Sequence, residues 1–175
     1  IGYSLYRRRL GVAVRTTSKA PPAIGAALAL EYRRILVPVV PGRPSDDALD
    51  VGLRLAKERG ARVIALTVIE VPLDLPLDAE LPELEDRANR ELDEAGGIGD
   101  SYGVRVTPRL VRGRSASTEI VEEARRRDTE IIVLGSPRKV LTQRRRGVFG
   151  ATVDRVMRNA PCRVMVTASR QVVTA

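Results

Sequence analysis

One glycine-containing loop in the second half of the chain has the residue types and the spacing that can hold a phosphate group. An apolar run ends at Gly135 and Ser136, a basic loop follows, and Gly150, Ala151 and Thr152 then begin an amphipathic segment. A strand that leads through a glycine loop into a helix directs backbone N–H groups and the positive end of the helix dipole at one anion. The pattern therefore predicts an anion site between this strand and this helix.

The loop itself brings positive charge to that candidate site. Its cations are Arg138, Lys139, Arg144, Arg145 and Arg146. Guanidinium and ammonium groups can bind a phosphate through charge where the backbone geometry is imperfect. The plainer interpretation is a solvated basic loop without a ligand, and the sequence leaves both interpretations open.

Residues suited to catalysis or to metal binding are scarce. The chain has no histidine and a single cysteine, Cys162. A serine nucleophile therefore lacks its usual base, and a lone cysteine excludes a disulfide framework and a multi-cysteine metal site. We expect Cys162 to be a small buried residue. The composition predicts a binding domain without a metal ion and not an enzyme.

The basic character of the chain is concentrated at its start. Residues 1–34 hold seven of the 30 lysine and arginine residues and one of the 22 acidic residues, so the rest of the chain is nearly neutral. A basic arm on a neutral domain favours contact with an anionic membrane surface. Aromatic residues, which stack on nucleic-acid bases, make up only 3% of the chain. This scarcity argues against a nucleic-acid partner.

The first residues resemble the end of a membrane helix. Ile1–Tyr6 contains two tyrosines and is followed directly by three arginines, as in an aromatic belt with a positive flank. These six residues are too short to span a bilayer, so an ordinary N-terminal arm stays open as the alternative. The predicted divisions are a membrane-helix end with its basic flank (1–9), a linker (10–32), a folded domain (33–168) and a C-terminal tail (169–175).

Apolar runs alternate with helical patterns through the predicted domain. Residues 35–40 form an unbroken apolar run, as expected of a strand buried on both faces, and Ser45 is expected to cap the next helix. Further strands are predicted at 62–68, 104–111, 130–135 and 163–167. This repetition predicts a doubly wound α/β fold with a five-stranded parallel sheet and helices on both faces. Ligands bind such sheets at the carboxyl ends of the strands, near Val40, Val68 and Gly135 here.

Single residues give further expectations for three elements. The helix that begins near residue 83 is expected to bury Leu84 and to weaken over the glycine-rich residues 96–99. Pro108 removes a donor from the third strand and therefore places it nearer an edge of the sheet. Ser115 is expected to cap the helix after that strand.

Four segments of the predicted domain resemble the universal stress protein (UspA-like) family. They are RRILVPV from residue 33, ALTVIEVP from residue 65, EIIVLGS from residue 130 and FGATVDRVMRNAPCRVMV from residue 149. The resemblance implies a flavodoxin-like, Rossmann-like sheet of order 3-2-1-4-5, a homodimer joined through the last strand, and ATP or another adenine nucleotide as the cofactor. It implies nucleotide-binding positions at Pro38, Val39, Val40, Val68, Gly135, Ser136, Arg138, Gly150, Ala151 and Thr152.

The chain departs from the family's nucleotide signature, in which Gly, two residues, Gly, nine residues and Gly precede Ser or Thr. Arg138 replaces the second glycine, and eleven residues separate it from Gly150. Ala151 takes the place of the hydroxyl residue, although Thr152 follows it. The aspartate that holds adenosine in the family corresponds to Val40. These departures argue against ATP binding, whereas the basic loop argues for some anionic ligand.

The N-terminal flank further resembles the junction in bacterial permeases of the amino acid–polyamine–organocation type that carry such a domain at their cytoplasmic C-terminus. The expected partner is then the chain's own transporter domain upstream of Ile1. The expected location is the cytoplasmic side of the plasma membrane, with a free cytoplasmic protein as the alternative. Two functions stay open: a regulatory domain that senses a nucleotide, and a structural, dimerising domain with a vestigial pocket.

Overall fold

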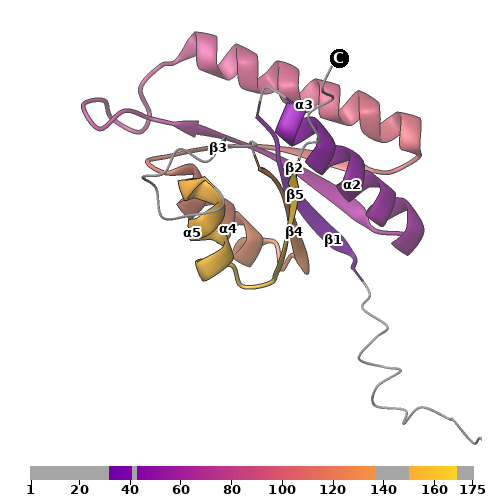
Figure 1. The fold of residues 1–175 in the computed structure, drawn as a ribbon. Helices are drawn as coiled ribbons and strands as arrows, with labels where there is room; N and C mark the ends of the chain where they lie inside the picture. The colour runs from indigo at the N-terminus through magenta and orange to yellow at the C-terminus, as the bar shows by residue number, and fades with distance from the viewer. Residues whose placement is uncertain (1–31, 41–42, 137–149, 169–175) are drawn as a thin grey trace, which may run out of the picture. The chain divides into compact units, whose positions relative to one another are not determined.

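The sheet of the domain has the predicted class and strand order. The computed structural model describes residues 32–40, 43–136 and 150–168. Its five strands lie parallel in the order β3-β2-β1-β4-β5 (Figure 1). The strands are β1 (Arg34–Pro38), β2 (Arg62–Glu70), β3 (Val106–Gly113), β4 (Ile131–Ser136) and β5 (Arg163–Ala168). The prediction of an edge position for the strand that contains Pro108 is thereby confirmed.

Helices cover both faces of the described sheet. They are α2 (Arg43–Arg59), α3 (Pro82–Tyr102), α4 (Ala116–Arg126) and α5 (Ala151–Asn159). The helices α2 and α3 pack on one face, and α4 and α5 pack on the other (Figure 1). The connections after β1 and β2 move one way across the sheet, and the later ones move back. Because such crossovers are right-handed, this reversal puts the two helix pairs on opposite faces.

The central strand β1 is buried on both sides. Ile35 and Val37 belong to the core beneath α2 and α3, whereas Leu36 belongs to the core beneath α4 and α5. Each of these three side chains is 0% exposed. Successive residues of a strand point to opposite faces, so a strand between two helical layers needs apolar side chains at every position. This explains the unbroken apolar run in the sequence.

Helix α3 is longer and more regular than the sequence predicts. It begins at Pro82 and continues through the glycines to Tyr102, where Gly103 ends it with φ of 69°. A Cβ on Gly99 would lie 2.3 Å from the Val106 side chain, so this glycine lets the helix approach β3. The expected burial of Leu84 is wrong, because this side chain is 42% exposed and lies at the mouth of a cavity.

A carboxylate from strand β2 accepts a hydrogen bond at the N-terminus of α4. Ser115 occupies the N-cap position, but its side chain makes no capping hydrogen bond; its hydroxyl lies 2.9 Å from that of Ser117. Glu70 instead accepts a hydrogen bond of 2.6 Å from the Ala116 N–H. Strand β2 runs two residues further than predicted, and this extension places Glu70 beside the helix start.

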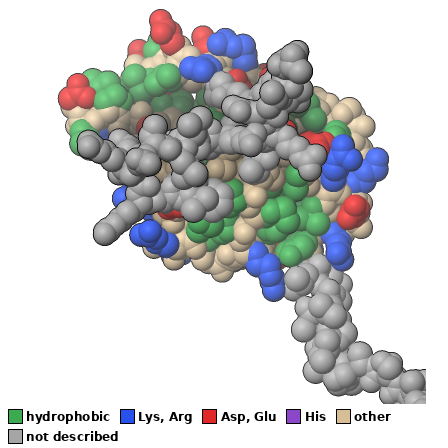
Figure 2. Space-filling model, in the orientation of Figure 1, with side chains coloured by type: hydrophobic (Ala, Val, Ile, Leu, Met, Phe, Trp, Pro, Cys, Tyr) green, Lys and Arg blue, Asp and Glu red, His purple; other side chains and the backbone are tan. Residues whose placement is uncertain are grey.

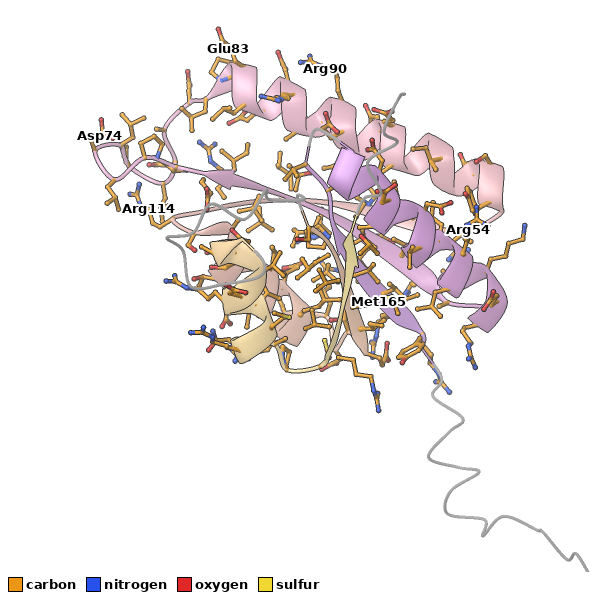
Figure 3. All side chains as sticks on the ribbon, in the orientation of Figure 1. Arg54, Asp74, Glu83, Arg90, Arg114 and Met165 are labelled. Atoms are coloured by element: carbon orange, nitrogen blue, oxygen red, sulfur yellow. The ribbon has the colours of Figure 1, made fainter. Side chains whose placement is uncertain are left out.

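Two arginines at the end of β3 hold the long proline-rich connection of residues 71–81. Arg114 donates to the carbonyls of Val71 at 3.0 Å and Leu75 at 2.8 Å (Figure 3). Arg112 donates to the Glu85 carboxylate at 2.7 Å and also bonds the carbonyl of Ala79. A connection of this length is uncommon without such ties. It is therefore an ordered part of the carboxyl edge of the sheet.

Candidate functional site

The structure brings most of the predicted site residues to one edge of the sheet. Pro38 ends β1 and pairs with Leu66 of β2, while β4 pairs with β1 on the other side. Val40, Val68 and Ser136 therefore all lie at the carboxyl ends of neighbouring strands. The order in which strands are added to the sheet reverses between β1 and β4, and this reversal is the switch point where doubly wound sheets bind ligands.

Two hydroxyl groups hold the backbone where β1 ends. Thr67 donates from its side chain to the Val39 carbonyl at 3.2 Å. Ser45 accepts the Val40 N–H at 3.0 Å. The prediction of Ser45 as an N-cap is wrong, because α2 begins at Arg43 and Ser45 lies within its first turn. Its hydroxyl bonds the end of the strand instead. A buried polar residue inside the apolar run of β2 was the signal that could have identified Thr67.

A cavity of about 310 Å³ opens beside these residues. It lies between the end of β1, the end of β2 and the first half of α3. Its residues are Val40, Thr67, Val68, Ile69, Glu70, Leu84, Arg87, Ala88 and Glu91. The walls are mainly apolar, and Glu70, Arg87 and Glu91 bring charge to the rim. Sequence analysis identified Val40 and Val68 but missed the α3 residues. The sequence of a helix does not show which strand end its face will approach.

The register of the ladder directs the backbone N–H and C=O of Val68 toward the side of β1. In a parallel ladder, alternate residues direct their N–H and C=O toward the same neighbouring strand. The Leu66 carbonyl accepts the Val39 N–H at 2.8 Å, so Leu66 faces β1. Val68 lies two residues further and faces the same side, but the ladder with β1 has ended at Pro38. Such a side-by-side pair can bond the polar edge of a flat heteroaromatic ring.

The predicted aspartate position is occupied by an exposed apolar side chain. Val40 is 55% exposed, and its N–H is already bonded to Ser45. A valine offers no acceptor for the hydroxyls of a ribose. The site therefore lacks one of the contacts that the family resemblance implies.

The end of β4 and the start of α5 form the other half of the predicted site. Gly135 and Ser136 pair with β5, and the Ser136 side chain is buried. Gly150 is the N-cap of α5 with φ of −66°, a conformation open to any residue, and no side chain bonds the helix start within the described residues. A Cβ on Gly150 would meet nothing within 4 Å there. Arg138 and the rest of the basic loop lie outside the described residues.

Nucleophilic catalysis by cysteine and metal binding have little support among the described residues. Cys162 is half-buried, and burial raises the pKa of its thiol above the ordinary value. A raised pKa leaves little thiolate at neutral pH, so the group is a poor nucleophile. No cluster of three or more Cys, Asp or Glu that could hold a metal ion occurs in the described part of the chain.

A doubly wound parallel sheet with a cavity at the carboxyl ends of β1 and β2 defines a flavodoxin-like α/β domain. Residues 31–168 match the model of the universal stress protein family. The chain belongs to the universal stress protein family. A universal stress protein of Methanocaldococcus jannaschii is 30% identical over 141 residues, which cover 77% of this chain and 81% of the relative. One of Methanothermobacter thermautotrophicus is 31% identical over 140 residues, covering 76% and 93%.

Solved structures share the fold at lower identity. A universal stress protein in complex with cAMP is 19% identical, has a TM-score of 0.64 and covers 78% of this chain and 97% of that one. The Archaeoglobus fulgidus protein in complex with dAMP is 20% identical, with a TM-score of 0.61 and coverage of 78% and 98%. A family protein of Arabidopsis thaliana with AMP bound is 17% identical, with a TM-score of 0.59 and coverage of 82% and 96%.

Within residues 32–40, 43–136 and 150–168, none of the helices combines the length and the apolar character that crossing a bilayer requires. The predicted end of a membrane helix at residues 1–9 lies outside the described residues.

Proposed function

We propose that this domain is a regulatory module that binds an adenine nucleotide at the carboxyl edge of its sheet. The observation that carries the proposal is the cavity beside Val68, where apolar walls meet a backbone donor and acceptor. An adenine ring needs such walls on its faces and such a pair at its edge. The volume of about 310 Å³ lies at the lower end of the range of small-molecule sites.

The phosphate groups of the ligand would lie toward α5. The start of this helix has no side-chain cap within the described residues, so its N–H groups suit an anion. The basic loop that includes Arg138 precedes it in the sequence. Related proteins of this fold were solved with AMP, dAMP and cAMP bound, which supports the choice of ligand class.

The departures from the family signature predict which part of the nucleotide contributes most to its binding affinity. Val40 cannot accept ribose hydroxyls, so recognition of the sugar is poor. Cations in the loop instead favour the phosphate groups. We therefore expect ATP to bind more tightly than AMP, and adenosine to bind weakest.

Isothermal titration of the full chain with ATP, AMP and adenosine tests the proposal. We expect Arg138→Glu to reduce the affinity for ATP by about tenfold or more, because it exchanges an attractive charge for a repulsive one. Arg90→Glu is the matched control, since Arg90 is exposed on α3 and outside the cavity (Figure 3). Unchanged affinity of Arg138→Glu would show that the loop is not the phosphate site. Absence of heat with every nucleotide at millimolar concentration would contradict the proposal.

Gly150→Ala offers a second test at the described half of the site. The backbone of Gly150 suits alanine and leaves room for a Cβ, so the variant should lose no more than about 1 kcal/mol of stability. A ligand that approaches the backbone here would meet the new methyl group. We expect weaker ATP binding with nearly unchanged thermal unfolding, and unaltered binding would place the phosphates elsewhere.

We further propose that the nucleotide is a ligand and not a substrate. The described residues supply neither a histidine base nor a metal cluster for phosphoryl transfer. Inorganic phosphate should therefore accumulate from ATP no faster with the protein than without it. A rate that scales with protein concentration would overturn this part of the proposal.

The proposed biological setting is the cytoplasmic face of the plasma membrane, where the domain would act on its own amino-acid transporter. The support is the aromatic and arginine pattern of residues 1–9, whose basic arm would also contact anionic lipid. The gene sequence upstream of Ile1 tests the attachment. It should encode a series of apolar spans of about 20 residues each.

A second function is favoured by the same departures. Val40 and Ala151 remove two polar contacts, and this removal fits a structural domain that dimerises through β5 while its pocket is vestigial. This alternative would be favoured if the protein forms a stable dimer and binds no nucleotide.

A further inference from the structure

Arginines gather at the opposite, amino-terminal edge of the sheet. Strands β1 and β2 begin with Arg34 and Arg62, which are direct partners in the parallel register. Two hollows, of about 720 Å³ and 250 Å³, lie at this edge and share Arg62. The arginines that line them, here called the arginine edge, are Arg33, Arg34, Arg59, Arg62, Arg105, Arg126 and Arg127.

Carboxylates at this edge are too few to balance the arginines. Glu130 pairs with Arg34 at 3.5 Å, Glu123 is shared by Arg126 and Arg127, and Asp128 lines the smaller hollow. Arg33 also has a partner. Among the described residues, none that lines the larger hollow is acidic. Figure 2 shows Lys and Arg side chains around the place where the chain enters the domain.

The guanidinium groups of three of these arginines have no partner within the described residues. They belong to Arg59, Arg62 and Arg105. The helix dipole accounts for the positive charge of Arg59, because this residue ends α2 and a cation is favourable at a helix C-terminus. They do not explain Arg62 and Arg105, which lie at and just before the starts of strands. Like charges on adjacent strands repel one another, so this edge carries charge that the fold itself does not need.

We propose that the arginine edge docks on an anionic phospholipid surface. The arginines spread from the start of β3 to the end of α4, so the charged area is wider than one small anion. Residues 1–31, which precede β1 in the sequence, have their own excess of basic residues. Among the described residues that line the two hollows, Tyr32 is the only aromatic one, which does not suit base stacking on RNA.

Docking in this way would fix the orientation of the domain on the membrane. The arginine edge and the cavity beside Val68 lie at opposite ends of the same parallel strands. With the arginine edge on lipid, the cavity opens toward the aqueous side. This inference rests on the described residues and not on the proposed transporter, so lipid docking and transporter attachment can fail independently.

The experiment is sedimentation of the full chain with vesicles of phosphatidylcholine, with and without phosphatidylglycerol. A single arginine near an anionic surface contributes a factor of about five to affinity. Arg62→Gln/Arg105→Gln should therefore bind the anionic vesicles about 25-fold more weakly than the wild-type chain. Arg62→Lys/Arg105→Lys keeps the charges and should bind like the wild type.

The matched control is Arg90→Gln/Arg155→Gln, which removes the same charge from exposed positions of α3 and α5 outside the two hollows. We expect it to keep most of the affinity. Equal binding by the wild type and both glutamine variants would assign binding to residues 1–31 alone and overturn the proposal. Equal binding to neutral vesicles, or tighter binding to a single-stranded RNA with the same dependence on Arg62 and Arg105, would overturn it too.

Discussion

At the scale of single residues, Glu123 has the most unusual environment in the described domain. Its side chain is 0% exposed, yet it is ionisable. Arg127 donates to it at 2.8 Å and Arg109 at 3.1 Å, and Arg126 also contacts it. Burial alone raises the pKa of Glu123, but the hydrogen bonds and charges of Arg127 and Arg109 outweigh burial and hold the pKa below its ordinary value. The carboxylate joins α4 to β3.

We predict that Glu123→Gln lowers the free energy of unfolding by about 3 kcal/mol at neutral pH, because it leaves the arginines without their shared anion. Glu122→Gln is the control on the same helix, where a half-exposed ion pair with Arg125 contributes at most about 1 kcal/mol. Urea unfolding measures both. Equal effects would show that the buried cluster adds nothing to stability.

The same group predicts how stability depends on pH. Because the folded-state pKa of Glu123 lies below the unfolded value of about 4.3, its contribution is complete above that value and is lost as pH falls through the folded pKa. The wild-type chain should lose more stability than Glu123→Gln below pH of about 4. Parallel pH curves for the two proteins would contradict this prediction.

At the scale of elements, α3 shows that glycines in one helix can have different roles. A Cβ on Gly96 or Gly97 would meet nothing within 4 Å. A Cβ on Gly99 would lie 2.3 Å from Val106 and 3.1 Å from the Val104 carbonyl. The sequence presents these glycines as one weak segment, whereas the structure separates one packing position, Gly99, from two positions that have room for a Cβ.

Gly97→Ala should therefore stabilise the domain by about 0.5–1 kcal/mol, because alanine has the higher helix propensity. Gly99→Ala should destabilise it by about 1–3 kcal/mol, because the added methyl group forces α3 away from β3. Thermal unfolding of the two variants gives the comparison. A gain in stability for Gly99→Ala would show that the contact between helix and strand is loose.

At the scale of the whole domain, each border of the sheet carries a different structural feature. The carboxyl edge holds the candidate nucleotide cavity, and the amino-terminal edge holds the arginines. Strand β5 ends the described sheet on one side. Its Met165 is 38% exposed (Figure 3). An edge strand presents unpaired backbone groups that another strand could bond.

For the proposed dimer through β5, we predict that Met165→Arg weakens self-association by about tenfold or more, since it places a charge at an apolar interface. Leu73→Arg is the control, because Leu73 is 88% exposed on the connection after β2. Sedimentation equilibrium measures both. A monomeric wild-type chain at all concentrations, or an equal effect of both variants, would argue against a dimer through β5.

The fold could be derived from the sequence almost completely. The unbroken apolar runs, the alternation of strands with helices and the position of Pro108 are local features, and each reflects burial or backbone bonding of the segment that carries it. Errors were confined to the ends of elements and to single side chains. Leu84 and Ser45 were misjudged because their contacts are with segments distant in the sequence or with the end of a neighbouring strand.

The sequence by itself determined the family and the layers, and it predicts the edge of the sheet where a ligand would bind. Only the tertiary structure decided which groups surround that place: the α3 residues at the cavity, the backbone of Val68 beyond the end of the β1 ladder, and the hydroxyls that hold the end of β1. It also decided that scattered arginines form one edge opposite the cavity. Periodicity follows from neighbours in the chain, whereas a site requires contacts between distant segments, which exist only once the sheet has formed.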